Sequence, residues 1–171
     1  LGVTNEQGRP REGQAAKFRQ INKFAELLGH LLTEAGLTSP LPLPAIALAT
    51  AGPLRVIDAG SGKGYLTFAI SALLGDSATV QGIEARPELA ALCNEIAGKH
   101  HFAPRLTFTA GTIADVPLAG ADVLIALHAC DTATDDALAQ GIAAGAKLIV
   151  VAPCCQKELR PQLTAPPARS R

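Results

Sequence analysis

Aromatic residues are scarce in this sequence, and methionine is missing. Trp and Met are absent, and the aromatic residues are one Tyr and five Phe. Proteins that bind single-stranded nucleic acid by stacking bases use aromatic rings as platforms, and few are available here. Long apolar runs are also missing, since none approaches the roughly 18 residues of a membrane helix. The sequence therefore argues against extended base stacking and against a membrane-spanning segment.

Cysteine spacing gives no sign of a disulfide framework. The four cysteines are Cys93, Cys130, Cys154 and Cys155, of which the last two are adjacent. Reduced thiols and a cytoplasmic location are the simpler interpretation. Residues 1–14 are polar, which is not the pattern of a secretory signal. Because the first residue is Leu, we expect the chain to be a fragment or a processed product.

Charge is balanced overall but uneven along the chain. Fifteen Lys and Arg oppose fifteen Asp and Glu, so bulk charge does not predict a polyanion-binding protein. Residues 1–24 (five basic, two acidic) and 156–171 (four basic, one acidic) are each net +3, whereas residues 25–155 hold six basic and twelve acidic residues. Two interpretations remain open: solvated termini, or basic ends that flank a cleft and contact an anionic substrate.

Hydrophobic patterning predicts one domain of alternating strands and helices. At 171 residues and 48% hydrophobic composition, the chain is large and apolar enough to bury a single core. Strands are expected at 55–59, 79–84, 105–110, 122–127 and 147–152, and helices at 15–35, 65–74, 87–100 and 132–144. The predicted organisation is a flexible arm (1–14), a helix with a Pro-rich linker (15–53), a core (54–155) and an irregular tail (156–171).

This alternation predicts the fold class α/β, a Rossmann-like doubly wound and mostly parallel sheet. Each strand–helix–strand unit then makes a right-handed crossover. Ligands bind such sheets outside the carboxyl ends of the strands, where the strand order reverses. The polar and Gly-rich segments of the sequence follow the predicted strands directly, so we expect the functional site at that edge.

The segment after the first predicted strand is the most informative. It reads Asp58-Ala59-Gly60-Ser61-Gly62-Lys63-Gly64, and its glycines allow a sharp turn with an unobstructed backbone. Glu84 ends the second predicted strand twenty residues later, where a carboxylate accepts hydrogen bonds from ribose hydroxyls. A phosphate-binding P-loop is excluded because Ile57 stands at its first Gly and Gly64 follows Lys63. The dinucleotide fingerprint fits poorly because Tyr65 replaces its third Gly.

The pattern acid-x-Gly-x-Gly-x-Gly resembles motif I of the class I S-adenosylmethionine-dependent methyltransferases. The resemblance extends over about residues 55–153. It implies S-adenosyl-L-methionine as cofactor, with Asp58 near the amino end of its methionine part and Glu84 on its ribose. The same resemblance assigns Gly60, Ser61, Gly62 and Gly64 to the cofactor turn. It places Thr112 and Ile113 loosely beside the adenine and Leu127 at the cofactor, although a plain loop at 110–115 is an equal alternative.

A His and Cys cluster follows the fourth and fifth predicted strands. The sequence Leu127-His128-Ala129-Cys130-Asp131 ends one strand, and Pro153-Cys154-Cys155 ends its expected neighbour. His128 and Asp131 are candidate catalytic residues, as a general base or an orienting group beside the acceptor, with Cys154 as a further contact. A tetrahedral zinc site from His128, Cys130, Cys154 and Cys155 is an alternative, although the spacing is no recognised zinc motif. Buried, structural cysteines are the third interpretation.

This Leu-His-Ala-Cys and Cys-Cys combination resembles one branch of the methyltransferase domains. That branch includes tRNA 2′-O-methyltransferase-like domains and other methyltransferase-like proteins, and it also carries the Gly-Lys-Gly-Tyr of residues 62–65. The resemblance implies that the methyl acceptor is an RNA, either tRNA or rRNA. A non-catalytic cofactor-binding module, a nicotinamide-dependent oxidoreductase and a zinc-dependent interaction domain are the alternatives.

The predicted helix at 15–35 carries Lys17 on its apolar face, with Gln20 at the edge of that face. A lysine there either extends to water or meets an anion. Our hypothesis is that Lys17 and Gln20 overhang the cofactor or a substrate phosphate. Class I sheets continue beyond a fifth strand, so we also expect this one to be truncated: either the remainder was removed, or a partner such as a second copy covers the edge of the fifth strand.

Overall fold

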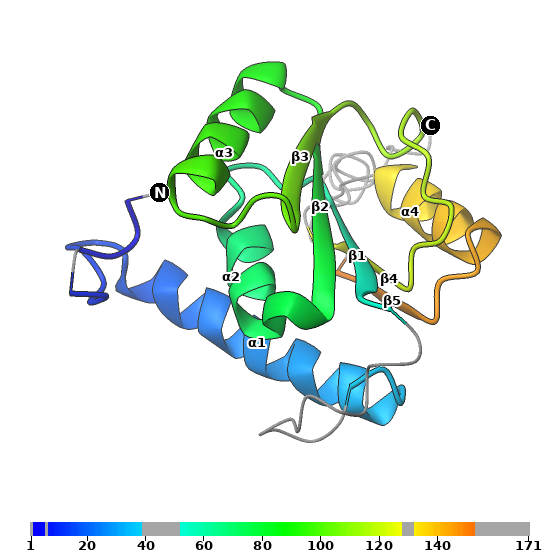
Figure 1. Cartoon of the computed structure of the whole chain (residues 1–171), viewed down its shortest axis with the longest axis horizontal. Coiled ribbons are helices and arrows are strands. Elements are labelled where there is room, and N and C mark those ends of the chain that lie inside the picture. The colour runs from blue at the N-terminus through cyan, green and yellow to red at the C-terminus, as the bar shows by residue number, and fades with distance from the viewer. Residues whose placement is uncertain (1, 6, 39–51, 128–131, 153–171) are drawn as a thin grey trace, which may run out of the picture.

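The computed structural model describes residues 2–5, 7–38, 52–127 and 132–152. Its helices are α1 (Ala15–Glu34), α2 (Tyr65–Leu74), α3 (Pro87–Lys99) and α4 (Thr132–Ala143), with a short 3-10 turn η1 (Gly75–Ser77). Its strands are β1 (Leu54–Ala59), β2 (Ala78–Glu84), β3 (Leu106–Ala110), β4 (Val123–Ala126) and β5 (Leu148–Val151) (Figure 1). Each of these helices and strands falls within one or two residues of the predicted position.

The strands form a five-stranded sheet in the order β3-β2-β1-β4-β5. All four pairings are parallel, with Asp58 opposite Gly82 in β2 and Ile125 in β4. The chain winds outward from β1 to β3 and then returns to place β4 on the other side of β1. The strand order therefore reverses between β1 and β4, which confirms the doubly wound Rossmann-like prediction. Within the described residues β5 is an edge strand, and its pairing with a second copy stays a prediction.

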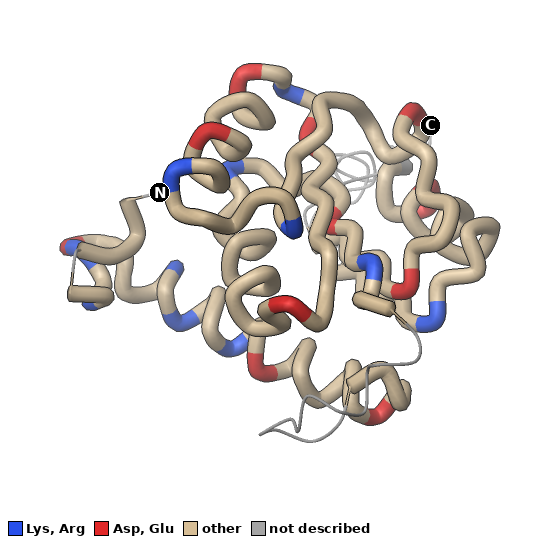
Figure 2. The backbone as a smooth tube through the Cα atoms, viewed as in Figure 1, with Lys and Arg blue, Asp and Glu red and all other residues tan. Residues whose placement is uncertain are grey.

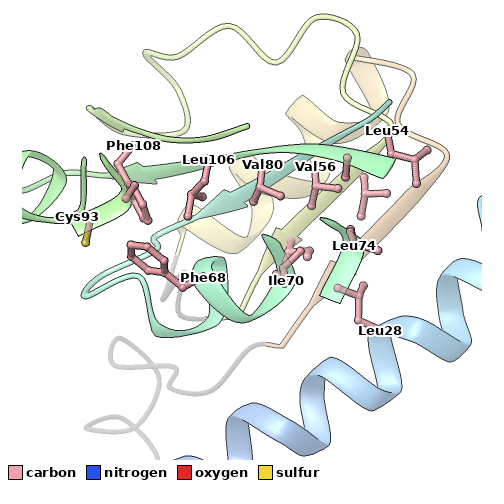
Figure 3. Packing of buried hydrophobic residues seen from close by; sticks show 14 of the residues in the cluster. Leu28, Leu54, Val56, Phe68, Ile70, Leu74, Val80, Cys93, Leu106 and Phe108 are labelled. Atoms are coloured by element: carbon pink, nitrogen blue, oxygen red, sulfur yellow. The ribbon is translucent and has the colours of Figure 1, made fainter. Parts of the chain in front are cut away.

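Two apolar layers cover the sheet. On one face, α2 and α3 pack against β1, β2 and β3, and α1 packs against α2 (Figure 1). Figure 3 shows Leu28 of α1 reaching toward Leu74 and Ile70 of α2, beneath a row of strand side chains. On the other face, α4 and residues 111–121 cover the strands, with Ile113, Leu118 and Ala137 among the buried residues. Fully apolar strands such as β4 need this burial on both sides.

The described residues that precede α1 form a closed turn. Thr4 bridges to Pro10, and the Asn5 side-chain oxygen accepts hydrogen bonds from the backbone amides of Gln7 and Arg9. Val3 is buried. No helix formed by the described residues combines the length and the apolar character that a membrane span requires.

Glycine at two positions allows the ring of Phe108 to pack closely against the backbone. A Cβ added to Gly82 in β2 would lie 2.5 Å from Phe108 Cδ1 and 2.9 Å from Ser61 Oγ. A Cβ added to Gly64 would lie 2.9 Å from Phe108 Cζ and 3.1 Å from Cys93 Sγ, at a backbone φ of +70°. The buried thiol of Cys93 and the ring of Phe108 therefore hold the start of α2 close to β2 and β3.

We expect Gly82→Ala to lower the free energy of unfolding by about 1–3 kcal/mol, because the new methyl group overlaps the Phe108 ring. Urea denaturation measures this change. The control is Gly98→Ala in α3, where a Cβ meets nothing within 4 Å and alanine favours the helix by up to about 1 kcal/mol. Equal stability of the two variants would contradict this account of the packing.

Candidate functional site

The turn between β1 and α2 is tied to the end of β2 by backbone amides. Gly60 and Ser61 both donate to the carbonyl oxygen of Ile83 at 2.9 Å, and the Gly62 amide donates to Glu84 Oε2 at 2.8 Å. Gly60 and Gly62 have φ values of +75° and +57°, a conformation that side chains disfavour. The glycines thus let the chain reverse tightly over the carboxyl end of the sheet.

Asp58 lies buried beneath this turn, near the end of β1. Its side chain is 3% exposed, and its Oδ2 accepts a 2.7 Å hydrogen bond from Thr67 Oγ1 of α2. Burial raises the pKa of Asp58 to about 6, although the Thr67 hydrogen bond opposes the shift. The site therefore holds a carboxylate whose charge is incompletely compensated by the protein, which suits a bound cation.

Glu84 ends β2 on the other side of the turn. Its Oε1 accepts hydrogen bonds from the Arg86 amide at 3.1 Å and from Arg86 Nε at 2.6 Å, while Oε2 accepts from Gly62. Burial opposes ionisation, but the hydrogen bonds from Arg86 and Gly62 outweigh it and hold the pKa of Glu84 below its ordinary value. Glu84 is accordingly a fixed, ionised carboxylate.

The first cavity, of about 380 Å³, opens beside these two carboxylates. It lies between the turn after β1, the ends of β2 and β4, and the first half of α1. Its lining residues are Lys17, Gln20, Ile21, Phe24, Asp58, Gly60, Ser61, Gly62, Lys63, Tyr65, Leu66, Glu84, Arg86 and Leu127. Lys17 Nζ lies 3.4 Å from Gln20 Oε1 and 5.8 Å from the centre of the Tyr65 ring. Lys17 and Gln20 thus reach the site from a helix distant in sequence.

The second cavity, of about 350 Å³, lies on the other side of Gly60, which lines both. Its lining residues are Ala59, Gly60, Ile83, Ala85, Gly111, Thr112, Ile113, Ala114, Ala133 and Asp136. Thr112 Oγ1 donates to Asp115 Oδ2 at 2.6 Å and so closes a turn after β3. Small and apolar side chains dominate the walls, which suits a flat, uncharged ring.

Most of the residues that the sequence suggested for the site are brought together in these cavities. Gly64 is an exception: it lines neither one and instead packs against Phe108 and Cys93. His128, Asp131 and Cys154 lie outside the described residues, as do Cys130 and Cys155. Among the residues that the structure does describe, no group of three or more His, Cys, Asp or Glu is placed to hold a metal.

Sequence reasoning missed several lining residues. Ile21 and Phe24 share the helix face of Lys17, but their apolar side chains were indistinguishable from core residues. Arg86 follows Glu84 by two residues, and its position at the N-cap of α3 was the available signal. Asp136 on α4 had no signal, because its approach to residues 111–114 depends on how α4 crosses the sheet.

A family model described as a methyltransferase domain matches residues 16–162. The chain therefore belongs to the methyltransferase domain family, whose methyl donor is S-adenosylmethionine. A Staphylococcus aureus protein assigned as a caffeoyl-CoA O-methyltransferase is similar in fold, with 12% identity, a TM-score of 0.53 and coverage of 80% of this chain and 63% of that chain.

Two further relatives differ in the acceptors that their names state. An RNA methyltransferase from Salinibacter ruber, in complex with S-adenosyl-L-homocysteine, is 19% identical with a TM-score of 0.42, covering 60% of this chain and 57% of that chain. A protein-L-isoaspartate O-methyltransferase from Caenorhabditis elegans is 43% identical over 47 residues, which are 28% of this chain and 21% of that protein. The chain thus spans less than two thirds of each of these relatives.

We expect Asp58→Asn to stabilise the empty protein at neutral pH. Between pH 3.8 and about 6 the folded state holds a proton that the unfolded state has lost, so stability falls as the pH rises through this window. Removing the charge recovers up to about 3 kcal/mol at pH 7.5 and little at pH 4. Thermal unfolding at the two pH values measures the difference.

The matched control is Asp76→Asn, because this side chain is 99% exposed and forms only a 3.6 Å ion pair with Arg105, so its removal should change the stability by less than about 1 kcal/mol at either pH. An Asp58→Asn variant that is less stable than the parent at pH 7.5 would show that the buried charge is compensated in the folded state.

Proposed function

We propose that this domain binds S-adenosylmethionine across the two cavities and catalyses methyl transfer to an RNA acceptor. One observation carries the cofactor assignment: two carboxylates, Asp58 and Glu84, flank a glycine turn at the point where the strand order reverses. Gly60 joins the two cavities there, so an elongated molecule can cross the turn without meeting a side chain.

In the first cavity the polar groups match the methionine half of the cofactor. Asp58 would receive the ammonium group, which supplies the positive charge that the buried carboxylate lacks. The N-terminus of α2 begins at Tyr65 without a side-chain cap from the described residues, so its amides and helix dipole favour the carboxylate group. Glu84, at the boundary of the two halves, would accept a hydrogen bond from the ribose.

In the second cavity the walls match the adenine. Ile83, Ala85 and Ile113 offer apolar surface to the faces of a ring. Thr112 donates its hydroxyl proton to Asp115, so its oxygen keeps a lone pair for an exocyclic amine. Asp136 offers a further acceptor at the rim.

The cofactor supplies an electrophilic methyl group on a sulfonium, which an acceptor atom attacks in line. The protein's contribution is to hold donor and acceptor about 3 Å apart and aligned. The glycine turn fixes the donor side through its hydrogen bonds to Ile83 and Glu84. On the acceptor side, we propose His128 or Asp131 as the group that orients the nucleophile or takes its proton.

The acceptor assignment rests on charge and on the motif resemblance. Lys17 and Lys63 line the first cavity, and within the described part of the chain neither forms an ion pair with a carboxylate. Figure 2 shows further basic residues in the first half of α1. A phosphate-bearing acceptor suits this arrangement. The Leu-His-Ala-Cys and Cys-Cys motifs favour RNA among such acceptors, and we propose that Lys17 and Gln20 contact its phosphate.

We expect Glu84→Gln to weaken binding of S-adenosylhomocysteine at least about tenfold, because a charged acceptor for the ribose is lost. In the parent protein, affinity should rise about tenfold per pH unit up to about pH 6 and then level off, as Asp58 ionises to meet the ammonium group. Asp58→Asn should bind weakly and without this pH dependence. Isothermal titration calorimetry from pH 5 to pH 8 measures both effects.

The control is Glu88→Gln, which makes the same change in charge and size elsewhere. Glu88 is exposed in the first turn of α3 and lines neither cavity. Unchanged affinity in Glu84→Gln would contradict the placement of the ribose.

We expect Lys17→Met to reduce kcat/KM for RNA about tenfold while leaving the affinity for S-adenosylhomocysteine unchanged, because a phosphate contact is lost. The assay follows a labelled methyl group from S-adenosylmethionine into total tRNA and rRNA. Arg19→Met, on the opposite face of α1, is the control and should not alter kcat/KM.

Lys17 and Lys63 would also attract an acceptor that carries a carboxylate. An isoaspartyl peptide in the same assay tests whether such a carboxylate is the methyl acceptor. Transfer to the peptide as a base-labile ester, with none to RNA, would replace the RNA proposal. Cofactor binding without transfer to either acceptor would favour a non-catalytic module.

A further inference from the structure

Arg86 occupies a position that a ribose bound to Glu84 would need. A carboxylate offers about four acceptor positions. Arg86 takes two of them on Oε1, through its amide at 3.1 Å and its Nε at 2.6 Å, and the Gly62 amide takes one on Oε2 at 2.8 Å. Counting donors from the described residues, one position is left, whereas the two hydroxyls of a ribose need two. A ribose that uses both hydroxyls must therefore displace one existing donor.

Two of the three donors cannot move without disturbing the fold. The Gly62 amide belongs to the turn that Gly60 and Ser61 anchor to Ile83. The Arg86 amide is fixed at the N-cap of α3, next to Pro87 in the first turn. The Arg86 side chain differs, because it is 61% exposed and can turn into solvent, although the Glu84 carboxylate that it contacts is buried. The donor that leaves is therefore Nε.

We propose that ribose binding to Glu84 releases the Arg86 guanidinium, which then forms an anion-binding site for a phosphate of the acceptor. This inference rests on the proposed function, since it requires a ribose at Glu84. Arg86 already lines the first cavity, together with Lys17 and Lys63. A free guanidinium binds phosphate through two parallel hydrogen bonds, which gives direction as well as charge.

The consequence is an ordered assembly of the site. In the empty protein, Arg86 is neutralised by Glu84 and contributes little to the attraction of a polyanion. With the cofactor in place, the ribose hydroxyls occupy the Glu84 carboxylate, and the guanidinium is free to bind an anion elsewhere in the cavity. Cofactor and acceptor then bind with positive coupling, and by linkage each raises the affinity for the other by the same factor.

A purely structural role for Arg86 would predict the opposite change in cofactor affinity when Arg86 is removed. If Arg86 were a permanent brace that orients Glu84, its removal would loosen the carboxylate and weaken cofactor binding. If Arg86 competes with the ribose, its removal strengthens binding. The sign of the change therefore separates the two roles.

The first test is calorimetry of S-adenosylhomocysteine with the parent protein, Arg86→Met and the control Arg19→Met, at pH 8, where Glu84 is ionised. We expect Arg86→Met to bind about two- to fivefold more tightly than the parent, because the guanidinium end of the pair is 61% exposed and water weakens its hold on Glu84. In the parent, affinity should increase with salt as the competing ion pair is screened, and in Arg86→Met this increase should disappear. Equal or weaker binding in Arg86→Met would overturn the inference.

The second test uses inorganic pyrophosphate as the anion. Its affinity for the parent and for Arg19→Met should increase severalfold when S-adenosylhomocysteine is bound, and the increase should vanish in Arg86→Met. Thermal unfolding of all three proteins verifies that they are folded.

Different results would contradict the proposed function and the inference about Arg86. No binding of S-adenosylhomocysteine to the parent defeats the proposed function and this inference together. Binding that depends on Glu84 but not on Arg86, or that shows no coupling to pyrophosphate, defeats this inference alone.

Discussion

Backbone amides of the turn after β1 donate to groups at the end of β2, and the arrangement of the site depends on these hydrogen bonds. Gly60 and Ser61 bind the carbonyl of Ile83, and Gly62 binds the carboxylate of Glu84. They hold the turn flat over the sheet, place Gly60 between two cavities, and fix one oxygen of Glu84. Because each of these hydrogen bonds joins the turn to the strand end, the two segments stabilise each other.

The two carboxylates beside this turn have opposite electrostatic environments. From the described part of the chain, Glu84 receives three hydrogen bonds and stays ionised, whereas Asp58 receives one from Thr67, and burial raises its pKa to about 6. The protein thus compensates the charge of one group and leaves the other to a ligand. In this view, Asp58 lowers the stability of the empty domain so that binding of a cation is more favourable, which is how functional sites commonly trade stability for affinity.

Helix α1 shows how an element outside the sheet can complete a site. Leu28 and Leu32 are fully buried and hold the helix against α2. One turn before Leu28, Phe24 lines the first cavity while also packing against the core, and about three turns before Leu28, Lys17 lines the same cavity. The same face of α1 therefore contributes to both the core and the first cavity.

The sequence by itself determined the element order and the two carboxylates, because these depend on local signals. Short apolar runs located the strands, apolar residues spaced three and four apart located the first helix, and Asp58 and Glu84 were identified by their distance along the chain from the glycines. What only the tertiary structure decided is which side chains meet across the sheet. Gly64 has the same sequence signal as Gly60 but packs against Phe108, and Arg86 and Asp136 acquire their positions from the crossings of α3 and α4. Contacts between distant segments depend on how layers pack, and a sequence pattern with a period of a few residues carries no information about that packing.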